Sequence, residues 1–291
     1  MTAQTPATST GIDSRGLGAV STAVTLMGIG SVVAKASAIE GPILAFHRAW
    51  LAAAIYVGLL LALGNRISRD SLRAAAPGGL AFGVQLGFFF SAIQLTTVAN
   101  ATMLIALQPI AILLFFSRQF GETVTRTELA LSAAALVGVG LVVFGSSDSP
   151  SWSPAGDLLA LGALATWTLY FVGSKKARQQ LGAFEYQGLS LLFSSAIMLP
   201  VTLIFSGTLH PGDGKWWWIP AMVAIPGTGH LLMNWAHPRV PLALVSELTL
   251  FSPVVSVALA AVVLDGEAVN VLQLGGMAMV LAALALLVRP K

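Results

Sequence analysis

Long apolar stretches alternate with short polar breaks along the whole chain. A helix needs roughly 20 apolar residues to cross a bilayer, and ten segments meet that requirement. They cover residues 17–36, 42–63, 74–95, 98–117, 127–145, 155–174, 184–206, 216–236, 240–263 and 268–288. Pro, Gly and Asn lie at several of the breaks, where helices begin or end. The pattern predicts an all-α integral membrane protein with ten transmembrane helices.

The chain contains two similar halves of five segments each. The fourth segment resembles the ninth, which aligns Pro109 with Pro253, and the first segment resembles the sixth. We therefore expect two five-helix repeats, at residues 17–145 and 155–288, in one transmembrane domain. Because five is an odd number, the second repeat must enter the membrane from the opposite side. The arrangement is that of an inverted repeat, which in transporters supports alternating access.

Composition is typical of a protein dissolved in lipid, since 56% of the residues are hydrophobic and 9% are charged. Cysteine is absent, which excludes disulfides and thiolate sites. The four histidines lack metal-ligand spacing, and no glycine-rich loop follows a strand. A membrane enzyme would need clustered acids or a nucleophile with a base, yet the acids of the spans are essentially Glu247, with Asp157 and Glu185 at span edges. We expect no enzyme, no catalytic residue, no metal and no cofactor.

Basic residues indicate how the chain is oriented. If the N-terminus lies on one side, twelve of the 15 Lys and Arg residues share that side, Lys215 lies opposite, and Lys35 and Arg48 lie within or at the edge of spans. The positive-inside rule then predicts that both termini are cytoplasmic. Residues 1–16 are polar and are predicted to form a disordered cytoplasmic tail. The charges form no continuous stripe, so we expect membrane lipid and no nucleic acid as a partner.

Two aromatic residues of the sixth segment are candidates for substrate binding. At about 1.5 Å per residue, Trp167 lies near the middle of the membrane, whereas Trp normally prefers the interface. Tyr170 follows nearly one turn later on a similar face. Both rings could stack on a planar substrate. A packed aromatic contact between helices is an equally good explanation.

Neutral polar residues occur at hydrocarbon depth, where an unpaired amide costs several kcal/mol. Each should therefore face a partner helix or a wet cavity. We expect these residues to line the cavity, with interhelical hydrogen bonding as the alternative. The candidates are Gln85, Gln108, His230, Asn234, Ser252 and Asn100.

Arg48 and Glu247 are charged residues inside spans, and such residues are functional candidates. Their depths make a direct ion pair between them unfavourable. Arg48 could bind substrate, but we favour a structural role in which backbone carbonyls hold the guanidinium. Glu247 could exchange a proton and so couple transport to a proton gradient.

Pro109 and Pro253 occupy matching positions in the middle of their spans. Each removes a backbone donor and permits a kink. The two residues are candidate gating positions, although Pro is also simply more common in membrane helices.

The chain resembles the drug/metabolite transporter superfamily in its ten-helix branch, the EamA family. The resemblance rests on Phe46-His47-Arg48-Ala49 followed by Leu51-Ala52, on the Pro109 and Pro253 spans, and on two turns, Phe120-Gly121-Glu122 and Asp265-Gly266-Glu267. Within the family, the chain is most similar to bacterial exporters of aromatic amino acids. The resemblance implies a small-molecule substrate, export, and a location in the bacterial inner membrane.

The leading hypothesis is a secondary transporter that exports amino acids or related metabolites by alternating access and functions as a monomer. A multidrug or nucleotide-sugar-like carrier is the alternative within the superfamily. A channel is the alternative from another class. A carrier saturates and shows counterflow, and an open pore does not.

Overall fold

The computed structural model describes residues 13–95, 98–145, 153–263 and 269–288. Within these ranges every regular element is helical, which confirms the predicted fold class. The helices of the N-terminal half are α1 (Ser14–Ser37), α2 (Gly41–Ala62), α3 (Arg69–Leu95), α4 (Val98–Ile105), α5 (Gln108–Ala111), η1 (Ile112–Phe116), η2 (Ser117–Phe120) and α6 (Arg126–Gly145). Those of the C-terminal half are α7 (Pro154–Ala177), α8 (Ala183–Ser206), α9 (Trp218–Ala236), α10 (Leu242–Leu248), η3 (Thr249–Phe251), α11 (Ser252–Val263) and α12 (Val271–Val288).

Nine helical segments within the described ranges are long and apolar enough to cross a membrane. They correspond to nine of the ten predicted spans. The remaining span, predicted at 216–236, is the 19-residue helix α9, in which His230, Asn234 and two prolines lower the hydropathy. α9 packs along α1 and also contacts α2 and α8.

The fourth and ninth spans differ from the continuous helices predicted at 98–117 and 240–263. The fourth consists of α4, α5, a π-helical turn (η1) and a 3-10 turn (η2), and the ninth consists of α10, the 3-10 turn η3 and α11. Pro109 lies at the start of α5 and Pro253 at the start of α11. Since proline cannot donate the helical hydrogen bond, each helix is interrupted at its proline.

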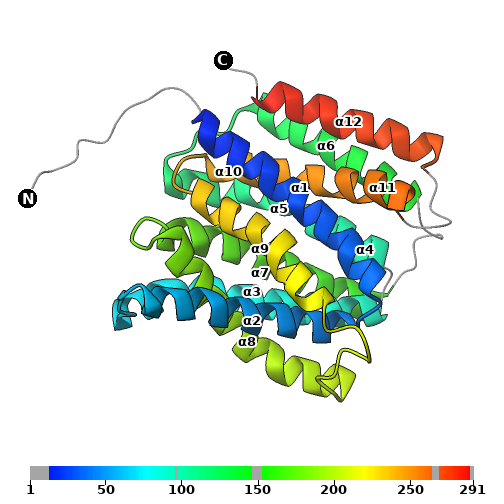
Figure 1. Cartoon of the computed structure of the whole chain (residues 1–291). Coiled ribbons are helices and arrows are strands. Elements are labelled where there is room, and N and C mark those ends of the chain that lie inside the picture. Colours follow the sequence, from blue (N-terminus) through cyan, green and yellow to red (C-terminus); the bar gives the residue numbers. More distant parts are fainter. Residues whose placement is uncertain (1–12, 96–97, 146–152, 264–268, 289–291) are drawn as a thin grey trace, which may run out of the picture.

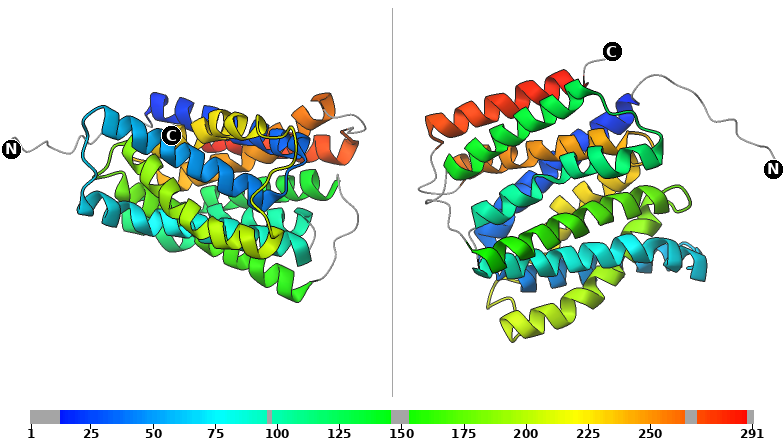
Figure 2. Two further views of the ribbon diagram at one scale, coloured as in Figure 1. Left: turned by 60° about the horizontal axis from the view of Figure 1, so that its bottom comes forward. Right: turned by 180° about the vertical axis from the view of Figure 1, so that it is seen from behind.

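Helices of the N-terminal half pack against helices of the C-terminal half in matching pairs (Figure 1). α1 packs along α9 as α7 packs along α3, and α1 contacts the ninth span as α7 contacts the fourth. α2 contacts α9 as α8 contacts α3, while α2–α8 and α6–α12 are pairs of corresponding helices. α6 and α12 form one edge of the bundle and α8 the other, as both figures show (Figure 2). Most of these contacts join one half to the other, so the middle of the bundle is shared.

The start of α1 and the end of α12 lie at the same end of the bundle (Figures 1 and 2). Asp13, before α1, lies 3.9 Å from Arg239 in the turn between α9 and α10. We call this end the termini face. The predicted tail at 1–16 lies mostly outside the described residues, but α1 already begins at Ser14.

Two glycines allow α6 and α12 to approach closely. A Cβ at Gly138 would lie 2.8 Å from the Gly276 carbonyl oxygen, and a Cβ at Gly276 would lie 2.6 Å from the Gly138 carbonyl oxygen. Gly138→Leu is therefore expected to lower the free energy of unfolding by about 3 kcal/mol, as overpacking does. Thermal unfolding in detergent measures the effect. Gly275→Leu is the matched control, because a Cβ there meets nothing within 4 Å, and equal losses in both variants would contradict the close contact.

Candidate functional site

Four rings form an aromatic cluster inside the bundle: Phe82 from α3, Trp167 and Tyr170 from α7, and His230 from α9. Tyr170 stacks on Phe82 with centroids 4.7 Å apart and on Trp167 at 5.2 Å. The His230 ring lies 5.2 Å from Phe82 and 6.3 Å from Trp167. The cluster therefore brings together three of the predicted site residues with Phe82, which was not predicted. It joins a helix of the N-terminal half to two helices of the C-terminal half.

Arg48 reaches this cluster from α2. Its Nη2 lies 3.5 Å from Nε2 of His230. Within the described residues no carboxylate lies within 4 Å of the guanidinium. The backbone-carbonyl anchor favoured from the sequence has no counterpart among the described hydrogen bonds. Arg48 is partly buried within a span, and because a cation there is costly without an anionic partner, this site favours a negatively charged group.

Asn234 belongs to a polar network beneath the cluster. Its Nδ2 donates to Gln187 Oε1 at 2.5 Å and to the Tyr170 hydroxyl at 3.4 Å. Its Oδ1 accepts from the Ser174 hydroxyl. The three partners are buried on α7 and α8. Asn234 thus links three helices and holds Tyr170, which is the interhelical role named as the alternative to cavity lining.

The other predicted polar residues lie on α3, α4, α5 and α11. Gln85 is buried one turn after Phe82 on α3 and shares its side of the helix. Gln108 is 1% exposed at the start of α5, and neither amide atom has a hydrogen-bond partner within the described part of the chain. Ser252 is the first residue of α11. Asn100 lies on α4, but its side chain is outside the described residues.

Glu247 lies on α10 and is 1% exposed. Its Oε1 contacts the hydroxyl of Ser132 on α6, while Oε2 has no partner in the ranges that the structure covers. Arg48 is not among the described partners of this carboxyl group. Glu247 is therefore a second polar site, separate from the aromatic cluster.

A latch between the two halves lies at the termini face. Glu122, in the turn after η2, accepts hydrogen bonds from the backbone N–H groups of Leu242 at 2.6 Å and Ala243 at 3.0 Å. The same carboxylate lies 2.6 Å from Nζ of Lys175, which also donates to the Val240 carbonyl at 3.3 Å. We call these contacts the Glu122 latch. In the sequence, Glu122 marks both the family resemblance and the repeat, in which it aligns with Glu267, but it was not predicted to be a site residue.

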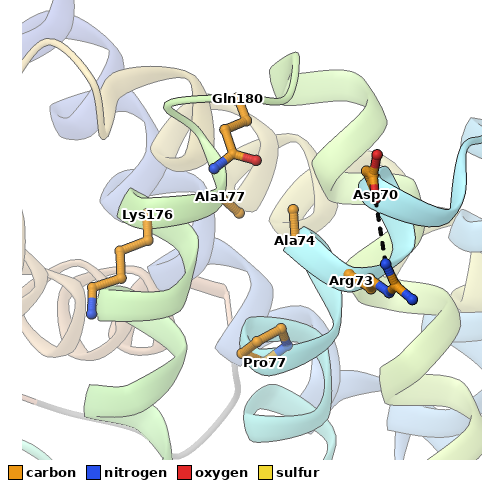
Figure 3. A pocket seen from close by; sticks show the side chains of 7 residues that line it. All are labelled: Asp70, Arg73, Ala74, Pro77, Lys176, Ala177 and Gln180. Carbon is orange, nitrogen blue, oxygen red and sulfur yellow. Dashed lines mark ion pairs between the residues drawn. The ribbon is translucent and has the colours of Figure 1, made fainter.

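A pocket of about 400 Å³ opens between α3 and the end of α7 (Figure 3). Lys176 and Gln180 project from one wall and Arg73 from the other, where it lies 3.7 Å from Asp70. The lining of the pocket is mixed, with Ala74, Pro77 and Ala177 beside the charged and amide side chains.

Comparison with known proteins agrees with this architecture. The model of the EamA-like transporter family matches residues 14–144 and 154–289. The threonine/homoserine exporter RhtA of Escherichia coli (strain K12) is 27% identical over 214 residues, which cover 70% of this chain and 68% of RhtA. The uncharacterized transporter YdeK of Bacillus subtilis (strain 168) is 28% identical over 186 residues, 61% of each chain.

One solved crystal structure matches with a TM-score of 0.79 and covers 94% of this chain and 96% of its own. At 20% identity, that likeness shows the fold alone. The family match covers both halves of the chain and almost all of its helices. The chain therefore belongs to the EamA-like transporter family.

Proposed function

We propose that this protein is a secondary carrier that exports amino acids across the bacterial inner membrane by alternating access. One observation carries the proposal: Arg48, a cation in the membrane region with no described carboxylate partner, meets His230 inside an aromatic cluster. The guanidinium is suited to the α-carboxylate that every amino acid carries. The relative RhtA is named as a threonine/homoserine exporter, which supports the same substrate class.

For the substrate side chain we favour an aromatic group. Tyr170 stacks on both Trp167 and Phe82, so a planar ring can replace one of these contacts without exposing polar surface. The small hydroxyl-bearing side chains of threonine and homoserine are the competing choice, and the name of RhtA favours them. Transport of aromatic amino acids, compared with that of threonine and homoserine, distinguishes these two choices.

We further propose that the halves, 17–145 and 155–288, are inverted repeats around this shared site. The exchange of helix contacts described above supports a two-fold relation, because the most extensive contacts between halves, α1–α9 with α3–α7, α2–α8 and α6–α12, have a counterpart or map onto themselves. The odd number of spans in each half requires opposite orientations. The distribution of Lys and Arg favours a cytoplasmic location for the termini face, and we propose that the monomer is the functional unit.

Alternating access needs parts that can move at both ends of the site. The interruptions at Pro109 and Pro253 divide the fourth and ninth spans into short helices that can tilt separately. The Glu122 latch ties the N-terminal half to α7 and α10 at the termini face. We propose that this latch closes the cytoplasmic side and that the breaks at the two prolines permit its opening.

Counterflow by the purified protein in liposomes tests the proposal. Saturable exchange of phenylalanine, tryptophan and threonine should be seen, and Trp167→Ala should raise KM for the aromatic substrates by about ten-fold, the effect of losing one stacked ring. The effect on threonine should be smaller. Trp217→Ala, at a side chain that is 58% exposed, is the control.

Two results would overturn this picture. Flux without saturation or counterflow would indicate a channel. Saturable exchange with the same KM for every substrate in Trp167→Ala would remove the aromatic cluster from substrate binding while leaving the carrier intact.

A further inference from the structure

We propose that Glu247 and Ser132 form a proton-binding site that couples amino acid export to the proton gradient. The inference rests on the proposed carrier function and names its driving force. In this site Glu247 is protonated in the described conformation, and the proton is the ligand. The site lies between α10 of the C-terminal half and α6 of the N-terminal half.

The number of available hydrogens supports the protonated form. Ser132 Oγ lies 2.8 Å from the Glu128 carbonyl oxygen and also contacts Glu247 Oε1. A serine hydroxyl has one hydrogen, and a carbonyl oxygen can only accept. If Ser132 donates to the Glu128 carbonyl, its contact with Glu247 needs a hydrogen from the carboxyl group. A neutral Glu247 satisfies both contacts at once, and an ionised one does not.

The surroundings of Glu247 offer little to stabilise a negative charge. Helices α5, η1, η3, α11 and α12 contain no ionisable residue. On α6, Glu128 is itself acidic and disfavours a second negative charge nearby. The remaining charged groups on packed elements lie at the start of α6, near the ends of α1 and α7 or on η2, and they are Arg126, Arg15, Lys35, Asp157, Lys175, Lys176 and Arg118. Lys175 is already paired with Glu122.

Loss of the proton would change the contacts of α10. The proton passes from Glu247 to water, and Ser132 then turns its single hydrogen from the Glu128 carbonyl to the new carboxylate. α10 has seven residues and ends at the 3-10 turn η3. Its first two residues are held by Glu122. The proton site and the Glu122 latch therefore contact the same short helix. Protonation of Glu247 can thus change the position of α10 and the contacts of the Glu122 latch.

Transport in liposomes separates proton coupling from substrate exchange. For the wild-type protein, an imposed pH gradient should drive accumulation of the amino acid, and adding substrate should move protons, detected with an internal pH-sensitive dye. Glu247→Gln keeps the shape of the neutral acid but cannot release a proton. This variant should retain counterflow and lose both gradient-driven accumulation and proton movement. Glu40→Gln, at an exposed residue, is the control and should retain all three.

Infrared spectroscopy of the full chain tests the protonation state without any substrate. The carbonyl stretch of a protonated carboxylic acid should be present in the wild type near neutral pH and lost in Glu247→Gln. Absence of that band in the wild type, or gradient-driven accumulation that survives in Glu247→Gln, would overturn the proposal. If counterflow itself were absent in the wild type, the carrier function would fail, whereas the infrared result would still decide the proton site.

Discussion

Arg48→Ala is expected to reduce amino acid exchange by more than about a hundred-fold, because two charge-assisted hydrogen bonds to the substrate carboxylate contribute about 3 kcal/mol. The guanidinium is the cation that extends into the aromatic cluster and contacts His230. No second Lys or Arg in the described ranges has a contact with these rings that could replace it. Initial rates of labelled amino acid exchange in liposomes measure the effect.

Arg48→Lys and Arg66→Ala are the matched comparisons. Lysine keeps the positive charge but cannot bind a carboxylate in the bidentate geometry of the guanidinium, so exchange should fall to an intermediate level. Arg66 is exposed in the turn between α2 and α3, and its removal should leave exchange unchanged. Normal exchange by a stably folded Arg48→Ala protein would show that the substrate carboxylate binds elsewhere.

Glu122→Gln is expected to slow exchange by at least about ten-fold, because the neutral amide weakens three charge-assisted contacts that hold the Glu122 latch closed. The slower exchange results from a change in the populations of the closed and open states. If the closed cytoplasmic state loses a few kcal/mol, the protein stays open to that side and completes fewer cycles. Exchange rates, together with binding affinity for substrate added from the latch side, report this shift.

A charge swap distinguishes the latch from a simple ion pair. In the double variant Glu122→Lys with Lys175→Glu, opposite charges remain, but residue 122 can no longer accept hydrogen bonds from the N–H groups of Leu242 and Ala243. The swap should therefore fail to restore exchange. Recovery to the wild-type rate would show that the attraction between the two charges is sufficient and that capping of α10 is irrelevant to gating.

The membrane-spanning character of the fold could be predicted because lipid imposes a strong one-dimensional pattern. Every backbone polar group must be satisfied within the span, so long apolar runs are expected to be helices. In the described ranges, nine helices are long and apolar enough to cross a membrane. The breaks near Pro109 and Pro253 were predicted only as kinks. Their replacement by π and 3-10 turns depends on packing in three dimensions, which the apolar pattern does not contain.

The composition of the candidate site was harder to predict than the fold. Trp167 and His230 were selected by depth and Tyr170 by its helical spacing from Trp167, and the structure brings the three together. Arg48 meets His230 across 182 positions of sequence, a contact that no helical period can reveal. Phe82 carried no signal, since an apolar ring inside a span is ordinary.

The Glu122 latch did carry a signal in the sequence. The two Glu-containing turns occupy matching places in the repeats, where Glu122 aligns with Glu267. A charged residue repeated at one position of both halves indicates a role tied to the symmetry of the fold. Glu267 itself lies outside the described residues.

The reactivity of single cysteines tests alternating access most directly, since the natural chain has no cysteine. Val240, beside the Glu122 latch, is 2% exposed, and Ile43, near the start of α2 at the opposite end of the bundle, is 3% exposed. A water-soluble thiol reagent should label Val240→Cys faster and Ile43→Cys more slowly when Glu122→Gln opens the latch. If both positions became more reactive together, or if neither changed, the two faces would not open alternately, contrary to this account.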